Sequence, residues 1–152
     1  MPARTEVSPA LPTRLFLYGT LLQCACNAVA VRLHRHLEPG LPAWVAGQLF
    51  AIPDPDGWYP ALVPGEGTVR GMVHDLAPGF DAELLADLDA YEGLHEDGSG
   101  EYRRQMIAVA TAAGEVSAAA YVYNAELPAG ARLLPEGDFS EFLARSGLPA
   151  FR

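Results

Sequence analysis

The chain has 152 residues, with 19 acidic residues against 10 basic ones and a formal net charge of −9. All ten basic residues are arginine, so chemistry that requires a lysine, such as a Schiff base or a phosphate-binding Walker motif, is excluded. The excess of acidic residues disfavours nucleic acid as a partner, because its phosphates would be repelled. The length is typical of a single domain.

Cysteine, histidine and apolar content indicate the class of protein. Cys24 and Cys26 have a single residue between them, too close for an easy disulfide, so we expect reduced thiols and a cytoplasmic protein. The histidines have no ligand spacing, and neither a metal nor a cofactor is expected. No apolar run approaches the roughly 20 residues of a membrane span. Residues 1–13 are expected to form a flexible tail before one domain at 14–152.

In the first half of the chain, the patterns predict one strand, one helix and then three strands. Leu15–Tyr18 is an apolar run that stops at Gly19. Ala25–Leu37 has apolar residues at every fourth position and predicts a helix. The three further strands are expected at Trp44–Ile52, Tyr59–Val63 and Thr68–Leu76. Turns are expected between them at Pro53–Gly57 and Pro64–Gly67.

In the second half, Asp81–Glu92 has the clearest helix pattern, with Asp81 as the N-cap and Gly93 as the stop. Its apolar stripe is formed by Leu84, Leu85, Leu88 and Tyr91. A hairpin is expected from Tyr102–Ala112 and Glu115–Tyr123. A last helix is expected at Phe139–Ser146, between an Asp138 cap and Gly147.

The order of these elements indicates the fold class. Strands follow one another too often without an intervening helix for a doubly wound parallel sheet. We therefore expect an α+β domain whose small mixed sheet is closed or strongly curled.

The first candidate site is the turn that begins at Tyr18 and continues through Gly19, Thr20 and Leu21. A glycine at the end of a strand lets successive backbone N–H groups point into one concavity, which binds a carboxylate without any formal positive charge. The simpler interpretation is an ordinary strand-ending turn.

The second candidate is Glu92, at the end of the predicted helix. The negative end of the helix dipole disfavours an ionised carboxylate there, which suits a group that transfers protons near neutral pH. The alternative is a solvated surface glutamate. The nearby Asp87 and Asp89 point to different sides of the helix and are expected on its solvated face.

The third candidate opens the strand that begins near Tyr102. Tyr102 and Arg104 share one face of that strand, and Arg103 takes the other. One arginine could bind a substrate carboxylate, or it could pair with one of the many acidic side chains.

Taken in sequence order, the motifs resemble the gamma-glutamylcyclotransferase-like family, including its gamma-glutamylamine cyclotransferases. The resemblance extends from Arg14 to Phe142 and rests on these strings: Arg14–Leu22, Gly47–Phe50, Tyr59–Leu62, Val69–Val73, Leu88–Gly93, Tyr102–Arg104 and Ala120–Tyr123.

The resemblance implies a fold, a site and a reaction. The fold is a small mixed β-barrel of five to six strands flanked by short helices. Glu92 matches the family's catalytic glutamate, and the Tyr18–Leu21 turn matches the segment that holds the glutamyl end of the substrate. Tyr102 matches a tyrosine that lines the cavity, and Arg104 is a further candidate substrate ligand.

The implied reaction releases 5-oxoproline and a free amine from a small gamma-glutamyl compound, without a metal or cofactor. The α-amine of the substrate attacks its γ-carbonyl, with Glu92 as general acid and base. Two alternatives stay open. One is a domain that kept the pocket for binding or interaction alone, and the other is an enzyme that trims a gamma-glutamyl group during natural-product assembly.

Overall fold

The computed structural model describes residues 11–19, 28–55, 57–91 and 100–147. The strands in this part of the chain are β1 (Arg14–Leu17), β2 (Leu41–Asp54), β3 (Gly57–Asp75), β4 (Tyr102–Thr111), β5 (Gly114–Tyr123) and β6 (Arg132–Leu133). The helices are α1 (Ala28–His34), α2 (Ala82–Tyr91) and α3 (Phe139–Ser146).

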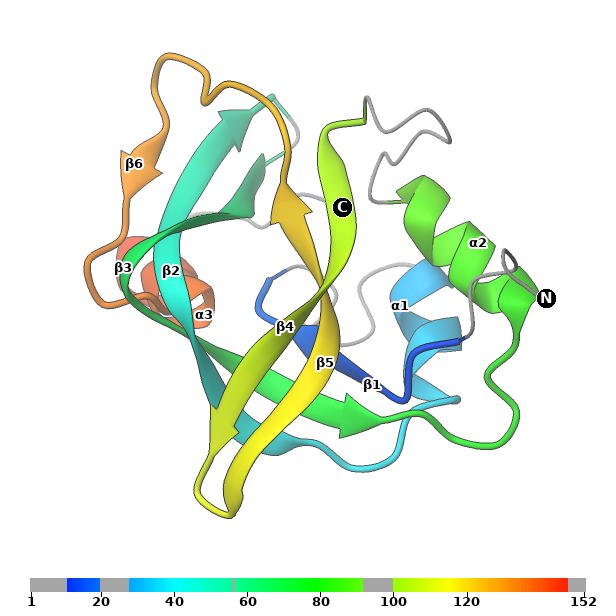
Figure 1. The fold of residues 1–152 in the computed structure, drawn as a ribbon. Coiled ribbons are helices and arrows are strands. Elements are labelled where there is room, and N and C mark those ends of the chain that lie inside the picture. Colours follow the sequence, from blue (N-terminus) through cyan, green and yellow to red (C-terminus); the bar gives the residue numbers. More distant parts are fainter. Residues whose placement is uncertain (1–10, 20–27, 56, 92–99, 148–152) are drawn as a thin grey trace, which may run out of the picture.

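The strands form one sheet in the order β3-β1-β5-β4-β2-β6, and a further pairing of β2 with β3 closes it (Figure 1). Strands β1 to β5 therefore make a closed barrel, and β6 adds to β2 from outside. The β1–β5 pair is parallel, whereas β1–β3, β2–β3 and β4–β5 are antiparallel. The predicted fold class, an α+β domain with a small mixed barrel and short helices, is confirmed.

Strand β1 is buried on both of its faces. Leu15 and Leu17 pack into one core cluster, and Phe16 packs into the other. Successive side chains of a strand point to opposite faces, so a strand that is covered on both sides needs a continuous apolar run. This explains the uninterrupted apolar sequence that predicts the strand.

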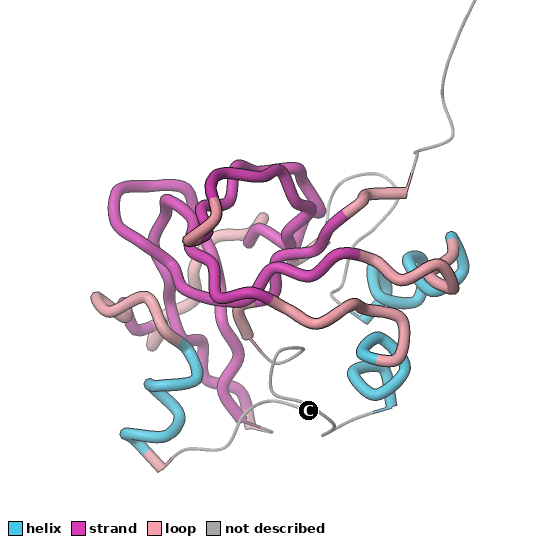
Figure 2. The backbone as a smooth tube through the Cα atoms, turned by 90° about the horizontal axis from the view of Figure 1, so that it is seen from below, coloured by secondary structure: helices cyan, strands magenta, loops and turns pink. Residues whose placement is uncertain are grey.

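The two core clusters lie on opposite sides of the barrel wall. One contains Phe139 and Phe142 of α3 together with interior residues such as Val69 and Val109. The other contains Leu33 of α1 and the buried leucines of α2. Accordingly, α1 and α2 lie together on one side of the molecule and α3 lies on the other (Figure 2).

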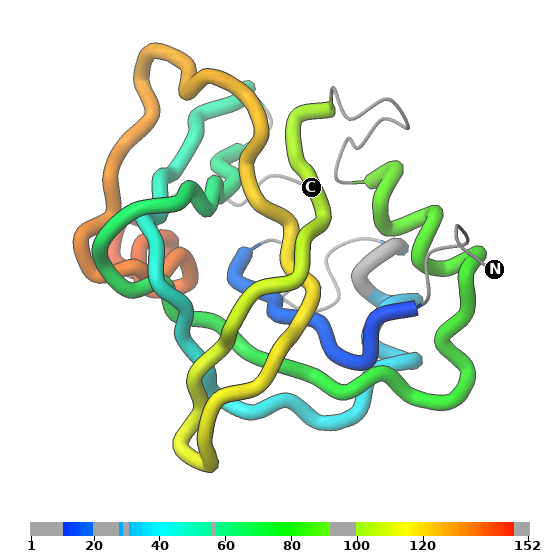
Figure 3. Tube along the Cα trace, in the orientation of Figure 1, coloured from blue at the N-terminus to red at the C-terminus, as the bar shows by residue number. Residues whose placement is uncertain are grey.

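Strands β2 and β3 form one long hairpin, which corrects the predicted break between Tyr59–Val63 and Thr68–Leu76. The turn predicted at Pro64–Gly67 is wrong, because β3 runs through it without interruption. Gly67 has φ +120 and lies against the carbonyl of Gly47, where the register of the two strands shifts. The glycines are accommodated as an irregularity that bends a continuous strand pair, as β-bulges do, and the two strands stay side by side (Figure 3).

Other boundaries differ by a few residues. The predicted helix Ala25–Leu37 is shorter in the structure, where α1 ends at His34 and Leu37 forms an isolated bridge with Leu76. Residues 25–27 lie outside the described part of the chain. Strand β2 extends beyond the predicted Trp44–Ile52 at both ends, and the two-residue β6 was not predicted.

Helix α2 begins as predicted. The Asp81 carboxylate accepts a hydrogen bond from the backbone N–H of Leu84 at 2.8 Å, which is the geometry of an N-cap. Leu84, Leu85 and Leu88 are buried against the sheet, as the predicted stripe requires. Gly93, the predicted stop, lies outside the described residues.

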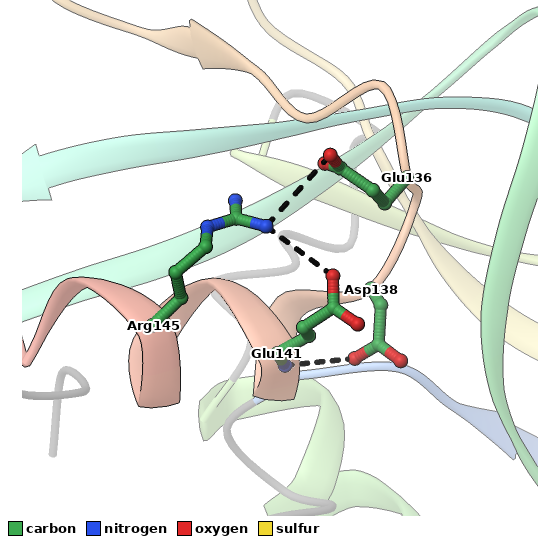
Figure 4. A network of polar contacts seen from close by, with 4 residues as sticks. All are labelled: Glu136, Asp138, Glu141 and Arg145. Atoms are coloured by element: carbon green, nitrogen blue, oxygen red, sulfur yellow. Dashed lines mark hydrogen bonds and ion pairs between the residues drawn. The ribbon is translucent and has the colours of Figure 1, made fainter.

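Helix α3 has both predicted caps, and Figure 4 shows the N-cap at Asp138. The Asp138 carboxylate accepts a hydrogen bond from the N–H of Glu141 at 2.9 Å, and Gly147 ends the helix in the left-handed conformation with φ 67. Arg145 lies 3.3 Å from Glu141 and 3.7 Å from Glu136, in exposed ion pairs. Exposed pairs of this kind add little stability, so the cap is the stronger local contribution.

His74 is the buried polar side chain of the described core, at 8% exposure. Its Nδ1 lies 2.9 Å from the carbonyl of Glu38, while no described group bonds its Nε2. Burial lowers the pKa of His74 from its ordinary value of 6.5, and the ring of His34, edge-on at 5.9 Å, lowers it further. The hydrogen bond to Glu38 opposes this shift, but the folded protein favours the neutral ring.

Replacing Asp138 by Ala should lower the free energy of unfolding by about 1 kcal/mol, because the N–H of Glu141 loses its acceptor. Urea denaturation measures the change. Glu136→Ala is the matched control, since it removes only an exposed ion pair and should change stability by less than about 0.5 kcal/mol. Equal losses in both variants would contradict the capping role.

Stability should fall as the pH is lowered through 6.5, and His74 should contribute to that loss. Since its folded pKa is depressed, the unfolded chain takes up the proton first, and the contribution present above pH 6.5 is lost below it. Urea denaturation at several pH values should show a smaller loss in His74→Asn, which keeps a donor for the Glu38 carbonyl. Identical pH profiles would contradict this assignment.

Candidate functional site

Tyr18 follows the last residue of β1 and is buried. Its hydroxyl donates a hydrogen bond to the backbone carbonyl of Tyr121 in β5. The same oxygen accepts a hydrogen bond from the backbone N–H of Leu62 in β3, at 3.3 Å. Tyr18 therefore connects two strands that flank β1, and the start of the predicted turn is held in the barrel wall.

Gly19 is required by space at this position. A Cβ atom on residue 19 would overlap the ring of Pro60, with the Cγ atom of the proline as the nearest neighbour. Any side chain here would push the turn away from β3 or displace the proline. The glycine thus allows the backbone at residue 19 to lie in direct contact with the strand.

Tyr102 is the first residue of β4, and it reaches the same segment of β3. Its hydroxyl donates a hydrogen bond to the carbonyl of Pro60 at 2.5 Å. Its ring packs edge-on against Tyr123, with centroids 5.4 Å apart. Three of the predicted site residues, from two distant parts of the sequence, therefore meet at Pro60–Leu62.

Several predicted site residues lie outside the described part of the chain. These are Thr20 and Leu21 of the turn and the predicted catalytic residue Glu92. Cys24 and Cys26 lie outside it as well. Tyr91, the last residue of α2, directly precedes Glu92 in the sequence.

Arg104 interacts with an acidic side chain that was expected on a solvated face. Its guanidinium donates to the Asp89 carboxylate of α2, and the Tyr121 hydroxyl donates to the other oxygen of that carboxylate at 2.7 Å. The predicted solvated position of Asp89 is wrong, because it lies one helical turn beyond the buried Leu85 and faces β4 and β5. Asp87 is exposed as predicted, and it pairs with Arg32 of α1.

Burial lowers the pKa of Arg104, but the hydrogen bond and the charge of Asp89 outweigh it and leave that pKa above its ordinary value. The guanidinium of Arg104 is therefore charged at any physiological pH. A role for Arg104 in binding substrate stays a prediction.

A second polar pair, Tyr59 and Glu101, lies beside Tyr102, and no sequence pattern predicted that these two side chains meet. The hydroxyl of Tyr59 donates to the carboxylate of Glu101 at 2.7 Å. Burial raises the pKa of Tyr59, and the hydrogen bond and charge of Glu101 raise it further. Burial and the same carboxylate raise the pKa of Tyr123. Both phenols are therefore neutral hydrogen-bonding groups at neutral pH.

Two kinds of feature are absent from the described residues, namely a cluster of metal ligands and a membrane-spanning helix. In residues 11–19, 28–55, 57–91 and 100–147, no three His, Cys, Asp or Glu side chains are grouped so that they could hold a metal ion. Within the same ranges, no helix combines the length and the apolar character that crossing a membrane would need.

This chain belongs to a family of known proteins. A model of the family described as gamma-glutamyl cyclotransferase, AIG2-like, matches residues 15–141, which is most of the chain. The resemblance inferred from the sequence motifs is confirmed.

Individual relatives agree with this membership. The gamma-glutamylcyclotransferase family protein YtfP of Escherichia coli is 43% identical over 92 residues, which are 60% of this chain and 66% of the relative. The match thus spans slightly less than two thirds of that relative's length.

Solved structures show the same fold. Bacillus subtilis YkqA matches with a TM-score of 0.62 at 22% identity, over 90% of this chain and 43% of YkqA. An AIG2-like protein from mouse matches with a TM-score of 0.57 at 21% identity, over 77% of this chain and 80% of the mouse chain.

Gly19→Ala should destabilise the protein strongly, by about 2 kcal/mol or more, because the new methyl group overlaps Pro60 in a packed interior. Thermal unfolding measures the loss. Adding Pro60→Ala to the Gly19→Ala variant removes the Cγ and Cδ atoms and should recover part of the stability. A Gly19→Ala variant as stable as the wild type would contradict the close contact.

Proposed function

We propose that this protein is a gamma-glutamyl cyclotransferase. It would release 5-oxoproline and a free amine from a small gamma-glutamyl amine or amino acid. The observation that carries the proposal is that Tyr18, Gly19 and Tyr102, the described residues that match the family's substrate site, converge on Pro60–Leu62. Membership of the family supports it independently.

The reaction requires little beyond positioning and proton transfer. The substrate carries its own nucleophile, since its α-amine closes a five-membered ring on the γ-carbonyl. Holding the chain in a conformation that is ready to cyclise supplies much of the acceleration. The α-ammonium must lose a proton before it attacks, and the departing amine must gain one, so one group that exchanges protons can serve both steps.

Glu92 is the residue we propose for these proton transfers. It comes directly after Tyr91, the last residue of α2. A carboxylate beyond the C-terminus of a helix experiences the negative end of the helix dipole, which favours its protonated form. A carboxyl group tuned in this way can accept the α-amine proton and return it to the leaving amine.

The substrate-binding residues we propose are Tyr18, Gly19, Thr20, Leu21, Tyr102 and Arg104. In a chain with a net charge of −9, backbone N–H groups of the Gly19–Leu21 turn are a suitable means of holding the substrate carboxylate or polarising its γ-carbonyl. The contact of Gly19 with Pro60 supports this role, since it fixes where the turn starts.

Glu92→Gln should reduce 5-oxoproline release by about 10²–10⁴-fold, because the amide can neither accept nor return the proton. The assay follows 5-oxoproline and free amine across a panel of gamma-glutamyl amines and amino acids. Glu83→Gln is the matched control, because Glu83 lies in the first turn of α2 and is exposed; its turnover should equal that of the wild type.

Normal turnover by the Glu92→Gln variant would contradict the proposed mechanism. The alternative function, a domain that binds small ligands without converting them, has a different signature. It would give thermal stabilisation by gamma-glutamyl compounds without 5-oxoproline release from any member of the panel.

A further inference from the structure

The carboxylate of Asp89 uses both of its oxygens to attach α2 to the barrel. Its Oδ2 accepts from Arg104 of β4, and its Oδ1 accepts from the hydroxyl of Tyr121 of β5 at 2.7 Å. Arg104 and Tyr121 lie directly opposite each other in the β4–β5 pairing. A single helix residue is thus bound to two adjacent strands at one point of the sheet.

Tyr121 also contacts the other half of the proposed site. Its backbone carbonyl accepts the hydrogen bond from the Tyr18 hydroxyl, and that hydroxyl is in turn bonded by the N–H of Leu62. A continuous series of hydrogen bonds therefore runs from Asp89 through Tyr121 to Tyr18, the residue before Gly19. It joins the last turn of α2 to the start of the substrate-binding turn.

The apolar contacts of α2 do not fix the position of the helix as exactly as these hydrogen bonds do. Leu84, Leu85 and Leu88 hold the helix on the sheet, but hydrophobic contact is non-directional and permits small shifts along the surface. Charged hydrogen bonds have defined lengths and angles. The side chains of Arg104 and Asp89 are only 20% and 24% exposed, so solvent screens their pair less than it screens a surface pair.

A second ion pair on the same helix provides a comparison. Asp87 pairs with Arg32 of α1, and these side chains are 48% and 44% exposed. This pair connects two helices at the surface. By its exposure it contributes little.

From this arrangement we infer that Asp89, Arg104 and Tyr121 form a positioning cluster, which sets the C-terminal end of α2 relative to the Tyr18–Gly19 turn. The catalytic consequence rests on the proposed function, in which Glu92 follows that end of the helix. Asp89 is then a positioning residue, and Arg104 has a second role beside its proposed substrate contact, because it holds the Asp89 carboxylate.

The test compares Asp89→Asn and Tyr121→Phe with the control Asp87→Asn, each in the full chain. Asp89→Asn removes the charge, and Tyr121→Phe removes the hydroxyl but keeps the carbonyl that Tyr18 uses. Both should lower kcat for 5-oxoproline release by about 10- to 100-fold with a smaller change in KM, because misplacement of a catalytic group affects the chemical step. Asp87→Asn should leave both constants unchanged.

Two further measurements separate positioning from general stability and from substrate binding. Hydrogen exchange of residues 82–91 should become faster in Asp89→Asn and Tyr121→Phe, and not in Asp87→Asn. In a double-mutant cycle, Asp89→Asn combined with Arg104→Gln should be no slower than the more impaired single variant.

The inference is overturned if Asp89→Asn matches Asp87→Asn in both kcat and hydrogen exchange. It is also overturned if Arg104→Gln raises KM alone while Asp89→Asn has no effect, because Arg104 would then bind substrate without positioning the helix. An inactive wild-type protein would instead reject the proposed function. The hydrogen-exchange comparison would still decide whether the cluster holds the helix end.

Discussion

The short strand β1 is the element on which the rest of the structure depends. Its four residues pair with β3 on one side and β5 on the other, and without it the barrel would be open between those strands. A strand in this place is covered on both faces, so its burial is set by two separate cores. Because Tyr18 comes directly after β1, its hydroxyl lies where it can bond both neighbouring strands. The closure of the barrel and the point at which the proposed substrate-binding turn starts are therefore one constraint.

The two sides of the barrel wall are held in different ways. On the α3 side, aromatic packing is supplemented by caps at both ends of the helix. On the side of α1 and α2, buried leucines hold the helices against the sheet. The partly buried carboxylate of Asp89 adds directional hydrogen bonds from α2 to β4 and β5. A helix that is held by apolar packing alone can shift slightly without a large loss of stability. In the proposed mechanism a reacting group follows the end of α2, which requires a more exact position, and the polar contact of Asp89 on the last turn of the helix meets this requirement.

The sequence patterns predicted correctly those features that depend on interactions between residues close together in the chain. The caps at Asp81 and Asp138 and the hairpin of β4 and β5 depend on neighbours within a few residues, and the structure has them where the patterns indicate. The break at Pro64–Gly67 was wrong because the irregularity is shared with Gly47 on another strand. Asp89 was misplaced for a similar reason, since its partners lie 15 and 32 residues further along. In the candidate site, the motifs predicted roles for Tyr18, Gly19 and Tyr102, but only the folded chain brings Gly19 and Tyr102 to Pro60.

The double role of Tyr121 has an evolutionary consequence. The hydrogen bond from the Tyr18 hydroxyl is accepted by the backbone oxygen of Tyr121. Every amino acid has this oxygen, so no substitution of Tyr121 removes the acceptor. Its bond to Asp89 depends on a phenol, which a single mutation can remove or restore. Substitution of Tyr121 alone can thus change the attachment of α2 to the barrel, while the hydrogen bond to Tyr18 is kept. Related proteins can in this way differ in the position of the end of α2 without a change in the closure of the barrel.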